Sequence, residues 1–304
     1  MRICSLLPSA TEIVYALGLG GQLCGVSHEC DFPPEAATKL TVIRSVFDPC
    51  TLSSLEIERA VIERVHRGEG VYTIDLDRLQ QAAPDLILTQ ELCDVCAVPY
   101  GEVTRAVERL DRRPRLLSLS PTLLGDVLAD VLRVGEATGW RAQAKSLVEG
   151  LQTRIDRVVT TVASAQERPA TFCLEWSDPV YVAGHWIPEM VELAGGTDGL
   201  GMKGKPSFAI EWDRVVHYGP EVIVLMPCGF GVERTVNELP CVTGLPGWSN
   251  LPAVKRGRVY AVNGSAYFNR PGPRLVDGLE LLGKILHPEL FPGPISDEMA
   301  RQVP

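Results

Sequence analysis

Short apolar runs alternate with amphipathic stretches along the whole chain. Seven runs of four to six residues are rich in Val, Ile and Leu, and they span residues 2–7, 23–27, 86–89, 116–119, 171–175, 222–226 and 259–262. None of them alternates strictly between apolar and polar positions, which is typical of strands covered by helices on both faces. The pattern therefore predicts an α/β fold built on parallel sheets.

The first helix has a predicted start and end. Ser9 and Glu12 have the S-x-x-E spacing of a capping box, in which the hydroxyl and the carboxylate accept hydrogen bonds from two backbone N–H groups. Apolar residues follow at Ile13 and Leu17, and Gly18 comes directly after them. Because glycine commonly ends helices, we expect this helix to run from Ser9 to about Leu17.

A much longer helix is predicted in the middle of the chain. Residues 140–166 contain no proline and a single glycine, Gly150. Apolar residues recur there at spacings of three and four: Leu147, Leu151, Ile155, Val158 and Val162. At 1.5 Å per residue such a helix is about 40 Å long. It would serve as a rigid connection between two α/β halves, or alternatively pack on one of them alone.

The two halves of the chain share a pattern. An Asp-Arg-apolar triplet stands at 77–79 and again at 213–215, and a proline with an acidic residue and an apolar run stands at 84–88 and again at 220–224. Both repeats are offset by the same 136 positions. The shared spacing predicts two related, Rossmann-like α/β lobes. We place the N-terminal lobe at 1–138, the connecting backbone helix at 139–167 and the C-terminal lobe at 168–304.

Composition and charge exclude several classes of partner. The 304 residues include 29 Lys and Arg against 38 Asp and Glu, a formal charge of −9. Such an acidic chain is not expected to bind nucleic acid or anionic lipid. No apolar run reaches the roughly 18 residues of a membrane span, and the first residues lack the pattern of an export signal. We expect a cytoplasmic protein as written, or a periplasmic or cell-surface protein if a leader is missing.

Aromatic residues gather in the predicted loops of the C-terminal half. Aromatic residues make up only 6% of the chain, yet these loops contain Trp176, Tyr181, Trp186, Phe208, Trp212, Phe230, Tyr267 and Phe268. Ligands of open parallel sheets bind at the carboxyl ends of the strands, where these loops lie. Flat aromatic faces suit a large, flat and mostly apolar ligand in a cleft between the lobes. The alternative is that they close the ends of the sheet.

Four segments, in order along nearly the whole chain, resemble one family. They are Ser5-Leu6-Leu7-Pro8-Ser9-Ala10-Thr11-Glu12, Gly25-Val26-Ser27-His28-Glu29-Cys30-Asp31-Phe32-Pro33-Pro34, Ala83-Pro84-Asp85-Leu86-Ile87 and Tyr267-Phe268-Asn269-Arg270-Pro271-Gly272-Pro273-Arg274. The set is similar to the substrate-binding components of bacterial ABC importers with a helical backbone, and above all to the cobalamin-binding component. The wider family also binds haem and iron–siderophore complexes.

The resemblance implies binding rather than catalysis, with a corrinoid as ligand and an ABC importer permease as a partner. Carried over by position, it places on the cleft loops Pro8, Ser9, His28, Glu29, Phe32, Phe208, Tyr267, Phe268 and Arg270. The predicted loops themselves add Trp176, His185 and Trp186. In this family, exposed acids on each lobe dock onto the transporter. Our candidates are Glu102 and Glu211, which could instead be solvated helix residues.

Cysteine and histidine in two cleft loops depart from the family pattern. His28 and Cys30 follow one predicted strand, and Cys93 and Cys96 follow another. These four side chains would make a Cys3His set suited to zinc. The pair Cys93 and Cys96 could instead be a redox couple, and a thiolate or imidazole could bind the metal of a corrin or haem axially. The remaining interpretation is incidental, structural thiols.

Nothing in the sequence supports an enzyme. The chain has no G-x-S-x-G, Walker, H-E-x-x-H or strand-following G-x-G-x-x-G motif. We therefore expect a non-catalytic protein that requires no cofactor, with a metal-binding or thiol-redox protein built on the Cys/His residues as the alternative.

Overall fold

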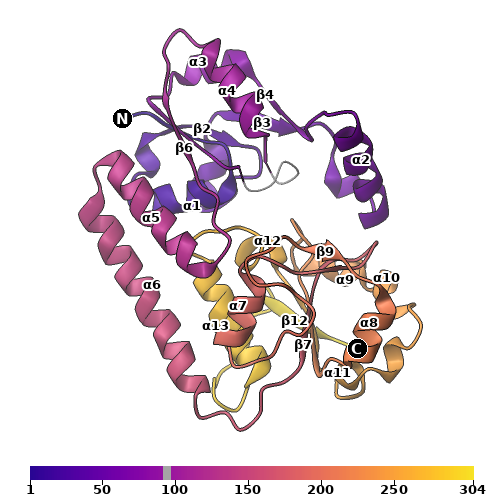
Figure 1. Cartoon of the computed structure of the whole chain (residues 1–304). Helices are drawn as coiled ribbons and strands as arrows, with labels where there is room; N and C mark the ends of the chain where they lie inside the picture. Colours follow the sequence, from indigo (N-terminus) through magenta and orange to yellow (C-terminus); the bar gives the residue numbers. More distant parts are fainter. Residues whose placement is uncertain (92–96) are drawn as a thin grey trace. The chain divides into compact units, whose positions relative to one another are not determined.

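Two six-stranded sheets organise the chain (Figure 1). The computed structural model describes residues 1–91 and 97–304. The chain folds into two compact units, which we call lobes. The N-terminal lobe comprises Met1–Pro121 and Gly125–Glu149, and the C-terminal lobe comprises Thr122–Leu124 and Gly150–Pro304. The two-lobed α/β fold predicted from the sequence is therefore confirmed, whereas the lobe boundaries drawn from the sequence stay a prediction.

The sheet of the N-terminal lobe has the strand order β4-β3-β2-β1-β5-β6. Its strands are β1 (Ile3–Ser5), β2 (Leu23–Ser27), β3 (Thr41–Ser45), β4 (Tyr72–Ile74), β5 (Leu86–Thr89) and β6 (Arg115–Ser118). Five are parallel and the edge strand β4 is antiparallel to β3. The helices are α1 (Pro8–Ala16), α2 (Ser54–His66), α3 (Leu76–Ala82), α4 (Tyr100–Glu108) and α5 (Leu124–Thr138), with short 3-10 turns at Gly20–Gln22, Pro34–Thr38 and Pro49–Thr51.

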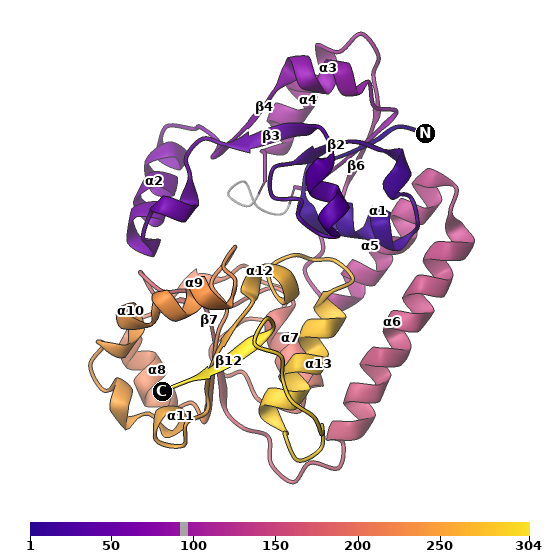
Figure 2. The same cartoon turned by 180° about the vertical axis from the view of Figure 1, so that it is seen from behind.

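The sheet of the C-terminal lobe has the order β12-β11-β10-β7-β8-β9. Its strands are β7 (Thr171–Trp176), β8 (Tyr181–Val182), β9 (Phe208–Ala209), β10 (Val222–Leu225), β11 (Val259–Val262) and β12 (Ala300–Val303). The central strands β7, β10 and β11 pair in parallel, whereas the pairings of β8, β9 and β12 are antiparallel. The helices are α7 (Ile187–Leu193), α8 (Trp212–Tyr218), α9 (Val232–Asn237), α10 (Leu239–Thr243), α11 (Pro252–Lys255), α12 (Gly264–Tyr267) and α13 (Leu275–Leu286), with a 3-10 turn at Trp248–Asn250. Helix α13 packs beside α7 (Figure 2).

Two expectations from the sequence are wrong. The sheets are mixed rather than parallel, because β4, β8, β9 and β12 pair antiparallel with neighbouring strands. The sequence pattern predicted none of these four strands, nor the parallel strand β3. Helix α1 begins at Pro8 with Leu7 as its N-cap, so Ser9 and Glu12 form no capping box and are buried within the helix. Proline is favoured at the first helical position because its missing N–H needs no partner there.

The repeat offset by 136 positions is a structural repeat. Helix α3 and strand β5 correspond residue for residue to α8 and β10 at that offset. Asp85 accepts a hydrogen bond from the backbone N–H of Arg2 at 2.7 Å, and Glu221 accepts one from that of Ala170 at 3.1 Å. In each lobe the acid thereby ties the helix-to-strand connection to the start of the neighbouring central strand.

The core of the N-terminal lobe lies on both faces of its sheet. Leu86 and Leu88 of β5 belong to a buried cluster with α1 and α5, while Ile87 belongs to a second cluster with α3 and α4. Neighbouring residues of the strand thus point into different apolar layers. This explains why Leu86, Ile87 and Leu88 are apolar in succession, as the sequence pattern indicated.

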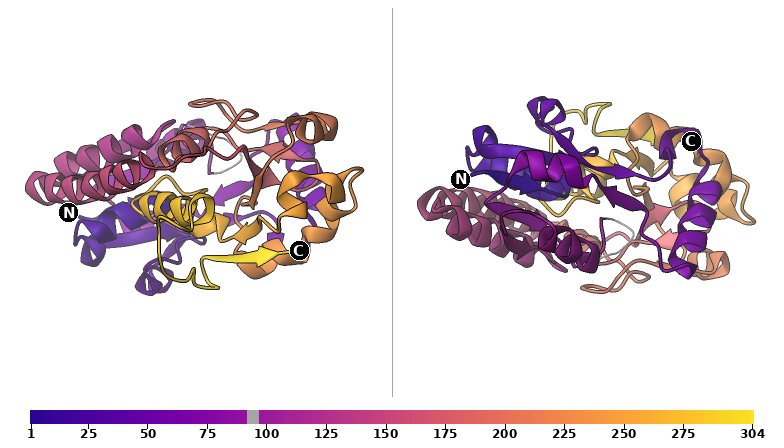
Figure 3. Two further views of the ribbon diagram at one scale, coloured as in Figure 1. Left: turned by 90° about the horizontal axis from the view of Figure 1, so that it is seen from below. Right: turned by 90° about the horizontal axis from the view of Figure 1, so that it is seen from above.

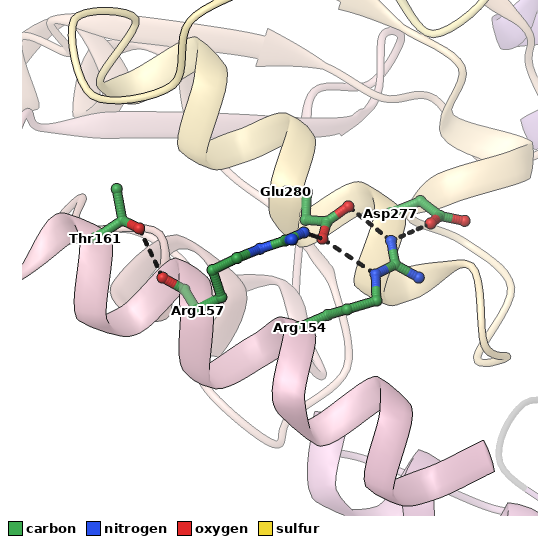
Figure 4. A network of polar contacts seen from close by, with 5 residues as sticks. All are labelled: Arg154, Arg157, Thr161, Asp277 and Glu280. Atoms are coloured by element: carbon green, nitrogen blue, oxygen red, sulfur yellow. Dashed lines mark hydrogen bonds and ion pairs between the residues drawn. The ribbon is translucent and has the colours of Figure 1, made fainter. Parts of the chain in front are cut away.

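The long helix α6 (Arg141–Val162) runs from one lobe into the other along the chain. Its first turns pack Ala144 into the core of the N-terminal lobe. In the C-terminal lobe, Arg154 donates hydrogen bonds to Asp277 and Glu280 of α13, and Arg157 donates to Glu280 at 2.7 Å (Figure 4). Ion pairs therefore hold the second half of α6 against α13.

Candidate ligand-binding site

In the N-terminal lobe, the carboxyl ends of β1 and β2 present the first predicted site residues. Pro8 is half-buried at the first turn of α1, whereas Ser9 is buried. His28 is exposed directly after β2, and Phe32 is 42% exposed. The side chains of His28 and Phe32 are thus accessible to a ligand at this edge, and Ser9 contributes to the packing of the helix.

A tyrosine that the sequence did not indicate joins this edge. The Tyr72 ring, at the start of β4, lies 5.9 Å from the His28 ring, and its hydroxyl donates a hydrogen bond to Glu29 at 3.2 Å. Tyr72 reaches His28 and Glu29 because β4 pairs with β3, and β3 in turn pairs with β2. Tyr72 thereby positions both site residues of the turn after β2.

The proposed Cys/His metal set is seen only in part. Cys93 and Cys96 lie outside the described residues. Cys30 is buried and its sulfur accepts a hydrogen bond from the Thr11 hydroxyl at 3.0 Å. Within 1–91 and 97–304, no group of three or more His, Cys, Asp or Glu side chains could hold a metal ion. The zinc site and the redox pair therefore stay predictions.

In the C-terminal lobe, aromatic side chains stand at the ends of β7 and β10. Trp176, the last residue of β7, lies 5.4 Å from the ring of Phe230, which follows β10. The guanidinium of Arg234 lies 4.7 Å from the centre of the same Phe230 ring. Trp176 is half-buried, and its indole Nε1 has no hydrogen-bond partner among the described residues. Trp176 is therefore the more accessible ring of this pair, since Phe230 is only 6% exposed.

His185 and Trp186 form a second aromatic pair. Their rings stack at 5.5 Å, and the Trp186 indole donates a hydrogen bond to the carbonyl of Phe268 at 2.8 Å. Both Trp186 and Phe268 are buried, so in this structure they hold the loops together. Burial lowers the pKa of His185, which favours the neutral imidazole. Its φ of 49° lies in the left-handed region that non-glycine residues seldom adopt.

The segment that follows β11 includes α12 and supplies two of the remaining predicted contacts, and β9 supplies another. Tyr267 and Arg270 are half-buried, and the guanidinium of Arg274 lies 5.9 Å from the Tyr267 ring. Asn269 donates to the carbonyl of Met226 at 3.3 Å, which ties this loop to the end of β10. Phe208 of β9 is half-buried and packs against the apolar core of the lobe. Tyr267 and Arg270 are therefore the more accessible of these side chains.

The acids of the two lobes differ in exposure. Glu102 is half-buried in the first turn of α4, and Glu211 is exposed just before α8. Glu175 of β7 accepts hydrogen bonds from the Ser207 side chain and the Gly184 backbone, but burial dominates and raises the pKa of its carboxyl. Glu175 is thus a structural acid, whereas Glu211 is available to a partner.

Comparison with known proteins adds the decisive observation. A family described as "Periplasmic binding protein" matches residues 3–266. The chain belongs to the periplasmic binding protein family. Members of this family bind solutes, which agrees with the expectation of a non-catalytic protein. No helix within the described residues has the length and apolarity needed to cross a membrane.

Named relatives of this binding-protein family cover most of the chain. A "Vitamin B12-binding protein" of Vibrio cholerae is 27% identical over 284 residues, which cover 92% of this chain and 86% of that protein. An "Uncharacterized ABC transporter substrate-binding lipoprotein YvrC" of Bacillus subtilis is 24% identical and covers 95% of this chain and 81% of that protein. A periplasmic heme binding protein from Pseudomonas aeruginosa has the same fold, with a TM-score of 0.73, 18% identity and coverage of 98% and 96%.

Proposed function

We propose that this chain is the solute-binding component of an ABC importer and that its solute is cobalamin or a related tetrapyrrole. The observation that carries the proposal is a pair of half-buried aromatic side chains near the strand ends of the C-terminal lobe: Trp176, which packs on the buried Phe230 ring, and Tyr267 at the end of α12. A flat macrocycle can lie against such rings, because stacking buries apolar area without requiring directional bonds.

The N-terminal lobe offers a complementary set of contacts at its own strand ends. His28 and Phe32 are exposed there, and Glu29 is held by Tyr72. In the proposal, these side chains are the contacts that the N-terminal lobe offers to the ligand. Cobalamin is favoured over haem because the relative that is 27% identical over 92% of the chain is named for vitamin B12.

A titration tests the proposed function. Purified protein is titrated with cyanocobalamin and, separately, with haemin and a ferric siderophore, while tryptophan fluorescence and visible absorbance are recorded. We expect saturable 1:1 quenching by cyanocobalamin with a Kd below about 1 µM. Tighter binding of haemin than of cyanocobalamin would show that the ligand is a tetrapyrrole but not a corrinoid. Failure of all three ligands to bind would contradict the proposal.

We further propose that the protein works on the outer side of the membrane, as the name of its lipoprotein relative suggests, and that Glu102 and Glu211 contact the importer. Exposed acids can pair with basic residues of a permease without contacting the ligand. Reversing both charges (Glu102→Lys with Glu211→Lys) should abolish ligand uptake by cells but leave the affinity of the purified protein unchanged. Normal uptake by this variant would exclude these two docking residues.

A further inference from the structure

The chain passes from one lobe to the other inside two helices. Helix α5 begins at Leu124, which belongs to the C-terminal lobe, and from Gly125 onwards it belongs to the N-terminal lobe. Helix α6 belongs to the N-terminal lobe before Gly150 and to the C-terminal lobe from that residue onwards. A third crossing, between Pro121 and Thr122, lies outside the helices. A glycine therefore stands directly at both helical crossings.

Each of these helices is held in its lobe on both sides of its glycine. In α5, Val131 belongs to the buried core of the N-terminal lobe. On the other side of the glycine, the Leu124 N–H donates a hydrogen bond to the carboxylate of Glu189 on α7 at 2.8 Å. In α6, Ala144 packs into the core of the N-terminal lobe, whereas Arg154 is bonded to α13 of the C-terminal lobe (Figure 4). The contacts on either side therefore do not involve the glycine between them.

Other glycines inside the long helices have a packing reason. In the N-terminal lobe, α5 lies beside the first half of α6 (Figures 1 and 3), and a Cβ at Gly135 would collide with that of Ala144. In α13, a Cβ at Gly278 would collide with the backbone at the end of α12. A Cβ at Gly283 of the same helix would lie 2.9 Å from the ring of Phe291. Glycine at these three positions permits a close approach that a side chain would prevent.

Gly125 and Gly150 have no such packing reason. Both are exposed. Outside each helix's own backbone, no atom of the described residues lies within 4 Å of the position that a Cβ would occupy. Glycine is nevertheless disfavoured inside a helix relative to alanine, because it has more freedom in non-helical conformations. What the two exposed glycines share is their position where a helix passes from one lobe to the other.

We propose that Gly125 and Gly150 form a hinge at which the two lobes change their orientation when the tetrapyrrole binds. The link to the ligand rests on the proposed function and adds to it the residues that permit the movement. Glycine reaches non-helical φ and ψ angles at little cost, so each helix can bend at its glycine while the packing on both sides stays intact. Helix α6 is therefore a hinged connection rather than the rigid one that its length suggests.

Spin-label distances between the lobes test the hinge. A noncanonical spin-labelled residue replaces exposed Arg109 of the N-terminal lobe and exposed Lys255 of the C-terminal lobe, since the nine cysteines rule out thiol labelling. In the variant Gly125→Ala with Gly150→Ala, alanine favours each straight helix by about 1 kcal/mol, so bent conformers should become about fivefold rarer at each position. Pulsed electron paramagnetic resonance should therefore give a narrower distance distribution than in the native protein. The matched control is Gly101→Ala, an exposed glycine in the first turn of α4 within one lobe, which should leave the distribution unchanged.

The outcomes separate the hinge from the proposed function. Equal widths in the native protein and the double variant would overturn the hinge, and so would the same narrowing in the control. Cyanocobalamin should narrow the native distribution, and a native protein that binds it without any change in the distribution would overturn the link between hinge and ligand. If the native protein binds no tetrapyrrole, the proposed function fails, while the widths of the ligand-free proteins still decide whether the two glycines form a hinge.

Discussion

The two lobes share one half of their sheets and differ in the other half. In both lobes a central strand (β1 or β7) pairs in parallel with a second strand (β5 or β10), and the helix before that second strand ends in a left-handed residue. Beyond the central strand, the N-terminal lobe continues with the parallel strands β2 and β3, whereas the C-terminal lobe continues with antiparallel β8 and β9.

This difference places different chemistry at the two edges. Parallel strands β2 and β3 end at the same edge, so their connections put the His28 turn and α2 there. In the C-terminal lobe the connection between β8 and β9 instead carries the stacked pair His185 and Trp186. The shared half therefore supplies a common scaffold, while the variable half supplies many of the proposed contacts.

The largest expected effect on stability concerns two equivalent core residues on β5 and β10, in the half of the sheet that both lobes share. Ile87 and Ile223 lie 136 positions apart and are fully buried. Replacing either with alanine should lower the free energy of unfolding by about 3 kcal/mol, since each change leaves a cavity in a packed layer. Urea denaturation followed by circular dichroism measures both losses. A cost below about 1 kcal/mol at one position would show that the two strands are not equivalent in packing.

The next largest effect on stability concerns the ion pairs between α6 and α13 in the C-terminal lobe. Arg154 donates to both Asp277 and Glu280 and is about one-third exposed, so Arg154→Met should cost about 1 kcal/mol after screening by solvent. Arg157→Met is the matched control with a smaller expected loss, because Arg157 contacts Glu280 alone and is more exposed. Thermal unfolding at low and high salt compares them. Equal losses of stability in the two variants would contradict the conclusion that Arg154 is the main contact between α6 and α13.

The ion pair between Arg154 and Glu280 predicts that the stability of the protein depends on pH. Burial raises the pKa of Glu280, but hydrogen bonds and charge from Arg154 and Arg157 outweigh it and lower the pKa below its ordinary value. A lowered pKa in the folded state means that the stabilisation is present above the unfolded value and is lost as the pH falls through the folded value. The difference in stability between the native protein and Arg154→Met should therefore shrink below about pH 4.5. A constant difference down to pH 3 would refute this.

The smallest effect concerns the left-handed residues that end α3 and α8. Ala83 has a φ of 41° and its equivalent Gly219 a φ of 62°. Gly219→Ala should lower the free energy of unfolding by about 1 kcal/mol, because a Cβ is strained in that conformation. Ala83→Gly should raise it by about 0.5 kcal/mol, since relief of strain exceeds the added freedom of the unfolded chain. Changes of the same sign would show that the two turns are under different constraints.

Sequence patterns predicted the parallel strands at the centre of each sheet and missed several short strands at or next to the sheet edges, for a physical reason. Strands such as β5 and β10 are buried at every position, and all their residues except Thr89 are apolar. Strands β8 and β9 have two residues each, too few for any period, and β12 includes the polar pair Arg301 and Gln302. Pairing with a neighbour, rather than their own composition, makes these segments strands.

The candidate site was predictable to a similar degree. Loops at the carboxyl ends of predicted strands led to His28 and Trp176, because the position of a strand end follows from the strand itself. Tyr72 could not be found in this way, since its contact with Glu29 spans 43 positions and depends on the pairing of the unpredicted strand β4.

The central claim is that this member of the periplasmic binding protein family binds a corrinoid. Native mass spectrometry of the purified protein, mixed with equal amounts of cyanocobalamin and haemin, tests it most directly. We predict one dominant complex with a single cyanocobalamin and little haemin complex. A dominant haemin complex, or no complex with either compound, would contradict the claim.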